Sequence, residues 1–222
     1  VANRNDGGDT KALAPTGVEL VWFDVAKGRH NSVAPAEAPV VNLAAKDKMN
    51  DMLLGNINLD QFWQDMRKAG ADPKLDLQAI WIEVGLKNLA INQELLMIIE
   101  KLRKNYSVGT LTNLTPSRQI LDEKIDLFSH FDYAILSCLE HLKKPDPAFY
   151  RLALKVASVK PEEVIFIDDK AVCVTTAEDL GMKGLIYSYP DNEKLVAGLR
   201  NLGISIWAKK LLGFRKLGLG NF

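Results

Sequence analysis

The chain has 222 residues, and its 28 Lys and Arg balance 28 Asp and Glu, so its formal net charge is zero. Binding to a nucleic-acid backbone needs a surplus of cationic side chains, so we expect no nucleic acid as the main partner. Hydrophobic residues make up 47% and charged residues 25%, which excludes disordered, collagen-like and coiled-coil classes. A domain of this length buries roughly 70% of the surface that its unfolded chain exposes, so it needs no disulfides to fold.

Cysteine content and hydropathy indicate the compartment. The two cysteines, Cys138 and Cys173, are too few for a disulfide framework and fit a reducing environment. No apolar run approaches the roughly 18–20 residues of a membrane span. Residues 1–17 are polar without an apolar period, so we expect a mobile leader there. We therefore expect a soluble intracellular protein, located in the cytoplasm or in an organelle after removal of a targeting segment.

The predicted elements fall into two blocks along the chain. A first strand is expected at 18–23, and a polar loop follows it. Helical segments are then expected at 40–54, 59–69, 75–89 and 92–104. From residue 106 onward, strand-like runs at 106–111, 132–136, 164–167 and 184–188 alternate with helix-like runs at 116–125, 146–157, 171–181 and 191–202.

Alternation of this kind is typical of parallel strands joined by right-handed crossovers, so we predict a Rossmann-like α/β sheet with helices on both faces. About 80 residues separate the first strand from the second, and they are largely helical. This predicts a core of residues 18–36 and 93–206 and a small helical cap of residues 37–92, inserted after the first strand. Sites in such sheets lie beyond the carboxyl ends of the strands, where we expect the cap to cover them.

Polar side chains follow three of the predicted strands at the point where each strand ends. Asp24 follows the first strand, Thr112 and Asn113 follow the second, and Asp168 and Asp169 follow the fourth. Because the carboxyl ends of parallel strands meet at one edge of a sheet, we expect these side chains to lie close together.

A lysine, Lys144, precedes the helix predicted at 146–157 and completes this set. The adjacent carboxylates of Asp168 and Asp169 repel each other unless a cation compensates their charge. With Asp24 they form an all-oxygen donor set, which suits Mg²⁺ better than a softer metal. A lysine with amide or hydroxyl donors is what a phosphoryl group requires. The sequence therefore predicts a magnesium site that handles phosphoryl groups.

Four stretches, in this order and spacing, resemble the motifs of the haloacid dehalogenase-like hydrolase superfamily. They are VWFDV (21–25), GTLTN (109–113), KKPDPAFY (143–150) and VIFIDDKAVCVTTAEDLGMKGL (164–185). The resemblance is to members with a small helical cap, such as sugar-phosphate phosphatases and the phosphatase domain of soluble epoxide hydrolase. It implies the fold predicted above and a Mg²⁺-dependent phosphohydrolase.

The resemblance also implies a role for each residue. Asp24 would attack phosphorus and form an aspartyl-phosphate, which water then hydrolyses. Thr112 and Asn113 would hydrogen-bond the transferring phosphoryl oxygens, and Lys144 would neutralise the charge on the nucleophile and the phosphate. The paired acids would join Asp24 in holding Mg²⁺, which screens carboxylate from phosphate. The cap would select a small phosphorylated metabolite.

Two positions depart from the family pattern. Ala26 stands where most of these phosphatases carry an Asp that acts as general acid and base, and residues 27–30 (KGRH) replace the usual sequence after it. Loss of that acid should cost about 10²–10⁴-fold in rate for a poor leaving group. Cys173 stands where Asn is common. These departures favour an alternative, in which a catalytically impaired relative serves as a structural or interaction subunit of a larger assembly.

Other branches of the superfamily fit less well. A phosphonate-cleaving branch also carries Ala at this position and uses a cap lysine, but Lys46, Lys48 and Lys68 have no such motif around them. The dehalogenases lack the paired acids. His30 is close to Asp24 in sequence and is the remaining candidate for the missing proton transfer.

Aromatic residues and the carboxyl-terminal segment complete the expectations. Phe62, Trp63 and Trp81 are expected in the core of the cap. Residues 207–222 hold four basic residues and no acid. They are expected either to pack on their own domain or to dock onto a partner protein.

Overall fold

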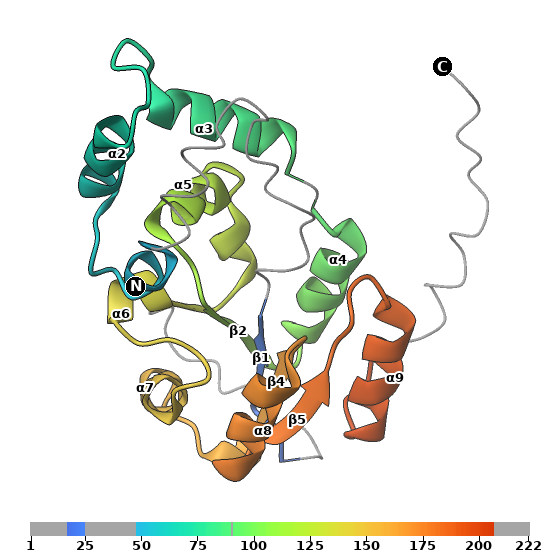
Figure 1. The fold of residues 1–222 in the computed structure, drawn as a ribbon. Helices are drawn as coiled ribbons and strands as arrows, with labels where there is room; N and C mark the ends of the chain where they lie inside the picture. The colour runs from blue at the N-terminus through green and yellow to red at the C-terminus, as the bar shows by residue number, and fades with distance from the viewer. Residues whose placement is uncertain (1–16, 25–47, 90, 207–222) are drawn as a thin grey trace, which may run out of the picture.

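The computed structural model of the chain describes residues 17–24, 48–89 and 91–206 (Figure 1). Its core is a five-stranded sheet in the order β3-β2-β1-β4-β5, and every strand pairs in parallel with its neighbours. The strands are β1 (Leu20–Phe23), β2 (Ser107–Thr112), β3 (Tyr133–Leu136), β4 (Val164–Asp168) and β5 (Lys183–Ile186). This confirms the predicted α/β class. Because β1 has β2 on one side and β4 on the other, the chain changes direction across the sheet at β1.

Apart from the short helix at 137–140, the helices named next follow the predicted ranges to within a few residues. The helix predicted at 40–54 is helical at 48–53, and its part before residue 48 lies outside the described residues. The labelled helices are α2 (Leu59–Lys68), α3 (Leu77–Lys87), α4 (Gln93–Leu102), α5 (Pro116–Lys124), α6 (Ser137–Glu140), α7 (Pro147–Ala157), α8 (Ala171–Asp179) and α9 (Asn192–Asn201), with 3-10 turns η1 (Leu127–His130) and η2 (Pro161–Glu163). The sequence did not predict α6, η1 or η2, because three or four residues are too few to show a helical period. Within the described ranges, no helix is long and apolar enough to cross a membrane.

Alternation along the central strand divides the core into two layers. Val21 and Phe23 belong to the apolar cluster that includes residues of α4 and α9, whereas Leu20 and Trp22 belong to the cluster that includes residues of α7 and α8. Successive side chains of a strand point to opposite faces, so a strand buried on both faces reads as a continuous apolar run. The continuous apolar run LVWF of β1 is therefore explained by helices on both sides of the sheet, and the exposed Glu19 precedes it.

Residues 48–89, which we call the insertion, contain helical residues 48–53 followed by α2 and α3. Their own apolar cluster contains Met52, Phe62, Trp63 and Met66, with Trp81 packed against it. This confirms the predicted burial of Phe62 and Trp63, whereas Trp81 is partly buried against the cluster. The domain boundaries at residues 36, 37, 92 and 93 stay a prediction.

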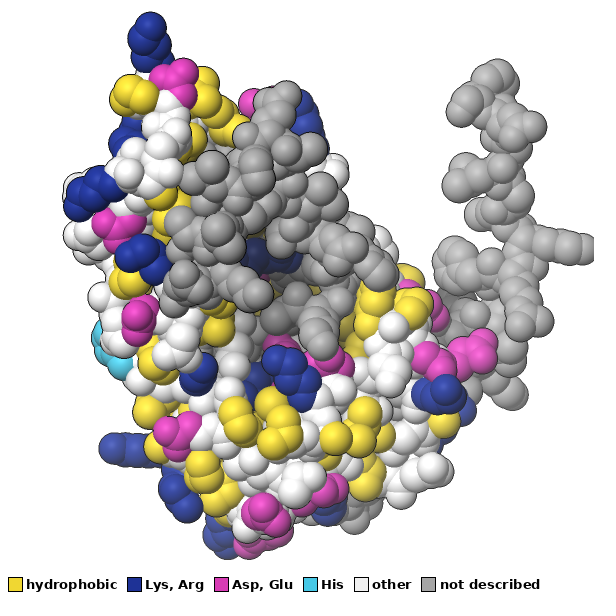
Figure 2. Space-filling view, in the orientation of Figure 1, with side chains coloured by type: hydrophobic (Ala, Val, Ile, Leu, Met, Phe, Trp, Pro, Cys, Tyr) yellow, Lys and Arg dark blue, Asp and Glu magenta, His cyan; other side chains and the backbone are white. Residues whose placement is uncertain are grey.

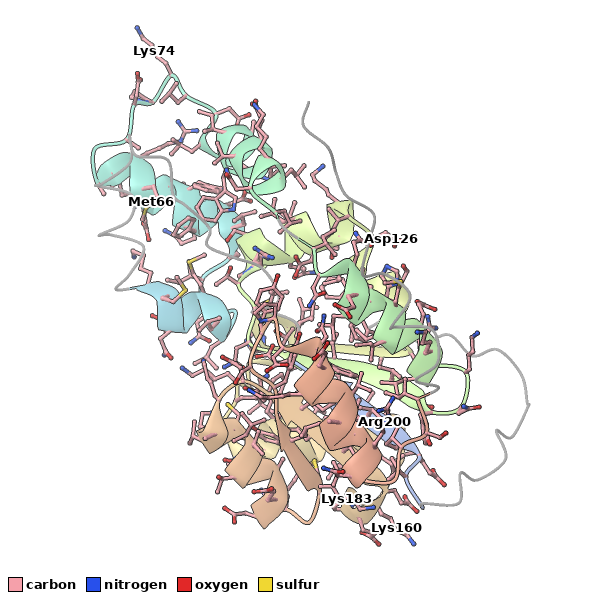
Figure 3. The ribbon with its side chains drawn as sticks, turned by 90° about the vertical axis from the view of Figure 1, so that its right-hand side faces the viewer. Met66, Lys74, Asp126, Lys160, Lys183 and Arg200 are labelled. Carbon is pink, nitrogen blue, oxygen red and sulfur yellow. The ribbon has the colours of Figure 1, made fainter. Side chains whose placement is uncertain are left out.

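The insertion lies at the end of the sheet where the strands finish. Figure 1 shows α2 and α3 at the top of the view, beyond the end toward which the β5 arrow points. In the view turned by 90°, Met66 of α2 lies near one end of the molecule and Lys183, where β5 begins, lies near the other (Figure 3). The carboxyl ends of the strands therefore face the insertion.

Gly109 provides a test of the central strand packing. It pairs with Trp22 across β1 and β2, and a Cβ at this position would lie 2.4 Å from Cζ3 of the indole ring. Gly109→Ala should therefore lower the free energy of unfolding by about 1–3 kcal/mol, as overpacking does in close-packed cores. Urea denaturation followed by circular dichroism measures this change. An unaltered midpoint would contradict the tight contact between Gly109 and Trp22.

Candidate functional site

Three carboxylates meet where β1 and β4 end. The register pairs Phe23 with Ile167, so the next residue of each strand, Asp24 and Asp168, come opposite each other. The Asp24 amide continues this pairing with a 2.9 Å hydrogen bond to the Ile167 carbonyl oxygen. One oxygen each of Asp24, Asp168 and Asp169 lie within 4.8 Å of one another. The structure thus brings together the three acids that the sequence predicted to meet.

Lys144 bridges two of these carboxylates. Its Nζ lies 3.0 Å from Oδ2 of Asp24 and 2.7 Å from Oδ2 of Asp168. The side chains of Lys144 and Asp168 are 1% and 0% exposed, and that of Asp24 is 9% exposed. Burial alone would lower the pKa of Lys144, but the two carboxylates outweigh it and raise the pKa. The ammonium therefore stays charged inside the site.

Asp168 is the most deeply buried acid of the three. Burial raises the pKa of its carboxyl, the charge of Asp24 raises it further, and Lys144 opposes both effects. Its Oδ1 accepts a 2.8 Å hydrogen bond from the amide of Lys170, the residue at the start of α8. Both oxygens are thus held by donors, which fixes the orientation of the carboxylate.

The donor atoms of this cluster suit a cation. Three carboxylates contribute oxygens to the cluster, and the Lys144 ammonium lies between two of them. Lys144 and Asp168 are buried, so the acidic and basic side chains seen at the centre of the face in Figure 2 are other, exposed residues. An all-oxygen donor set of carboxylates is the environment that Mg²⁺ prefers.

Thr112 and Asn113, at the end of β2, contact the same cluster. Thr112 Oγ1 donates a 3.0 Å hydrogen bond to Oδ1 of Asp24. Asn113 donates from Nδ2 to the Lys144 carbonyl oxygen at 2.9 Å, and its Oδ1 accepts from the Lys144 amide at 2.8 Å. The predicted contacts of both residues with phosphoryl oxygens stay predictions. The structure adds that Asn113 holds the backbone of Lys144.

Sequence reasoning missed Ser137. Its fully buried hydroxyl accepts from the Leu114 amide at 3.0 Å and donates to the Leu114 carbonyl oxygen at 3.3 Å. The ends of β2 and β3 are tied together by this pair of contacts. Ser137 begins the short helix α6, which has no periodic signal, so no motif marked this residue in the sequence.

The remaining candidates divide into two groups. Ala26, residues 27–30 and Lys46 lie outside the described residues, as do the leader up to residue 16 and the segment 207–222. Lys48 and Lys68 contact Asp65 of α2, with Nζ–O distances of 2.7 and 3.6 Å, rather than the acidic cluster.

Cys173 is buried on α8, next to the site. Its carbonyl oxygen accepts a 2.9 Å hydrogen bond from the hydroxyl of Tyr150. Burial raises the pKa of its thiol, and the nearby Asp168 carboxylate raises it further. The thiol therefore stays protonated at neutral pH and is a poor nucleophile.

The buried ion pairs of Lys144 with Asp24 and Asp168 lead to a stability prediction. Lys144→Met would leave Asp24 and Asp168 buried without their shared cation, which should lower the free energy of unfolding at neutral pH by roughly 3–5 kcal/mol in metal-free buffer. Burial and like charge raise the pKa of Asp168, so the folded variant takes up a proton before the unfolded chain does. The deficit should therefore shrink as the pH falls from neutral.

Denaturant titrations across the acidic range measure this deficit. Lys155→Met is the control, because Lys155 is an exposed residue of α7 and its removal takes away the same charge. A deficit equal to that of the control, or one that grows toward acid, would contradict the shared role of Lys144.

Known proteins share this fold and sequence pattern. A family model described as haloacid dehalogenase-like hydrolase matches residues 17–181. The chain is 32% identical over 119 residues to the chloroplast flavin mononucleotide hydrolase 1 of Arabidopsis thaliana, covering 54% of this chain and 47% of that protein. It is 34% identical over 91 residues to the glyceraldehyde 3-phosphate phosphatase of Pyrococcus furiosus, covering 39% of this chain and 37% of that protein. The chain thus spans about half or less of the length of these relatives.

Solved structures agree on the fold. A haloacid dehalogenase family enzyme from Bacteroides thetaiotaomicron, solved as an Asp-to-Ala variant with magnesium and inorganic phosphate, superposes with a TM-score of 0.65. The match covers 78% of this chain and 96% of that one at 18% identity. The family model covers well over half of the residues, including β1, β2 and β4 with the carboxylates that follow them. The chain belongs to the haloacid dehalogenase-like hydrolase family.

Proposed function

We propose that the protein is a Mg²⁺-dependent phosphohydrolase that acts on a small phosphorylated metabolite. One observation carries the proposal: a buried lysine bridges two carboxylates at the carboxyl ends of adjacent strands, with a third carboxylate beside them. This arrangement combines a nucleophile, a cation-binding group and a charge neutraliser within hydrogen-bonding reach of one another.

Asp24, Asp168 and Asp169 are the residues that would hold the metal. One carboxylate oxygen of each already lies within 4.8 Å of the others, which is a spacing that a single cation can bridge. Bound Mg²⁺ would screen the negative charge of the carboxylates from that of a phosphate. The Bacteroides structure named above, with its magnesium and inorganic phosphate, supports this assignment.

Asp24 is the proposed nucleophile. Its Oδ1 accepts from Thr112 and its Oδ2 faces Lys144, so both oxygens are oriented before substrate arrives. One oxygen would attack phosphorus while the bond from phosphorus to the substrate oxygen breaks, which leaves an aspartyl-phosphate. Water would then attack this phosphorus and regenerate the carboxylate. Lys144 and Thr112 would donate to the transferring phosphoryl oxygens and stabilise their charge.

Two further positions, Asn113 and Ala26, bear on the mechanism. Asn113 would act mainly by fixing the backbone of Lys144, to which it makes two hydrogen bonds. Ala26 has no proton to give to the leaving oxygen, so we expect activated leaving groups to react best.

The relatives support a small phosphorylated substrate. The Arabidopsis relative is named for hydrolysis of flavin mononucleotide, and the Pyrococcus relative for removal of phosphate from glyceraldehyde 3-phosphate. The chloroplast location in the name of the first supports the predicted alternative of an organelle. A protein partner docked through residues 207–222 also stays a proposal.

The activity prediction uses an aryl phosphate with a good leaving group. The protein should hydrolyse it in the presence of Mg²⁺, and Asp24→Asn should reduce the rate to background because an amide cannot form the phosphoenzyme. Lys144→Met should reduce kcat by roughly 10²–10³-fold, as expected for loss of one preorganised electrostatic contact. Steady-state kinetics measures both effects.

Asp179→Asn is the matched control, because Asp179 is exposed at the end of α8, outside the cluster, and its rate should be unchanged. Full activity of Asp24→Asn would contradict the covalent mechanism. A lack of turnover over a panel of phosphomonoesters would instead support the structural or interaction subunit.

Metal binding has a separate prediction. Titration calorimetry should show Mg²⁺ binding to the wild-type protein and none to Asp168→Asn, because this change removes a buried carboxylate charge from the cluster. The Asp179→Asn control should bind as the wild type does. Equal binding by Asp168→Asn and the wild type would place the metal elsewhere.

A further inference from the structure

The insertion touches the core at residues 137–143, a short segment that comprises α6 and the loop after it. The contact is closest at Gly55, where a Cβ would lie 2.0 Å from the carbonyl oxygen of Cys138 and 2.9 Å from its carbon. The φ angle of Gly55 is +67°, a conformation that other residues rarely adopt. Both the close approach and the backbone conformation therefore require glycine at this position.

Two side chains of the same core segment reach back to the insertion. His141 lies with Nδ1 2.7 Å from the carbonyl oxygen of Leu54, and because a carbonyl oxygen only accepts, Nδ1 is the donor. The Lys143 ammonium donates to Oδ1 of Asn50. Residues 50–55 are thus held at three successive points along 137–143.

This core segment directly precedes Lys144 and is held at both of its ends. Ser137 is hydrogen-bonded to Leu114 at the start of the segment. Lys144 is hydrogen-bonded through its backbone to Asn113 just beyond the end of the segment. Consecutive residues after β2 therefore hold both ends, and the insertion rests on the stretch between them.

A second contact between the insertion and the core also lies on a segment that follows one of the strands of the site. Gly85 of α3 faces the side chain of Leu121 on α5, the helix that begins directly after Asn113, Leu114 and Thr115. The insertion therefore contacts the two core segments that continue from the ends of β2 and β3, and the second of these leads directly to Lys144.

We propose that Gly55 and His141 are positioning residues, which seat the insertion on residues 137–143 and thereby hold Lys144 in place against Asp24. This contact between residues 50–55 and 137–143, which we call the seat, sets how the insertion closes over the carboxylates and where the Lys144 ammonium lies. For its catalytic consequence this inference rests on the proposed phosphohydrolase function. The structural part of the inference, the seat, depends only on the contacts of residues 50–55.

Gly55→Ala tests the seat, and Gly70→Ala is its matched control. Gly70 also lies in the insertion at a positive φ of +108°, but a Cβ there would meet no atom within 4 Å. Both variants place alanine in strained backbone, and Gly55→Ala alone would push against the core. Gly55→Ala should speed hydrogen exchange in peptides covering 48–56 and 137–144, whereas Gly70→Ala should leave both at wild-type rates.

Kinetics with the aryl phosphate distinguishes positioning from a general loosening. Gly55→Ala should lower kcat by about 10-fold or more, since small displacements of a catalytic group are costly. A rise in KM with kcat unchanged would show that the insertion acts on substrate retention alone and would overturn the link to Lys144. The Gly70→Ala variant should stay within about twofold of the wild type in both constants.

His141→Gly is the second variant, used if Gly55→Ala fails to fold. It removes the contact with Leu54 without adding bulk, and glycine accepts the φ of +54° at this position. His141→Asn keeps a side-chain donor and tolerates the same φ, so it should restore part of the protection that His141→Gly loses. Wild-type exchange rates in both segments of a folded Gly55→Ala or His141→Gly variant would overturn the proposal. If the wild-type protein shows no turnover, the proposed function fails, while hydrogen exchange still decides the seat.

Discussion

The ammonium of Lys144, shared between Asp24 and Asp168, is the interaction on which the site depends. Two carboxylates this close and this buried repel each other, and without a cation one of them would have to take up a proton. The sheet fixes both acids through the register of β1 and β4, so the backbone cannot move them apart. A buried lysine resolves the conflict by staying charged between them.

That requirement extends into the rest of the fold. A lysine side chain is long and flexible, so its ammonium is placed well only if its backbone is held. Asn113 supplies this hold with two hydrogen bonds, and Ser137 ties the start of the same loop to Leu114. Three strands thus position the ion pairs of Lys144: β1 and β4 present the acids, and the residue after β2 holds the loop that carries the lysine. Residues 50–55 of the insertion contact that loop at Cys138, His141 and Lys143.

The sequence was sufficient to predict the acids and the lysine as one site, because parallel strands bring all their carboxyl ends to the same edge. Asp24, Thr112 and Asp168 could be placed from strand ends alone, and the two-faced burial of residues 20–23 (LVWF) follows from their continuous apolar run. The contact between Gly55 and Cys138 could not be predicted, since a close approach of two backbones leaves no periodic pattern. The same holds for Asn113, whose amide could equally have faced a ligand, and for Ser137 on a helix too short to predict.

The central claim is that the three carboxylates beside Lys144 form a divalent metal site. Crystals soaked in Mn²⁺, which binds oxygen ligands as Mg²⁺ does and scatters anomalously, test it directly. The account predicts an anomalous peak within about 2.5 Å of carboxylate oxygens of Asp24 and Asp168, with Lys144 still beside them. A fully soaked crystal with no peak at this position, or with its peak on other residues, would contradict it.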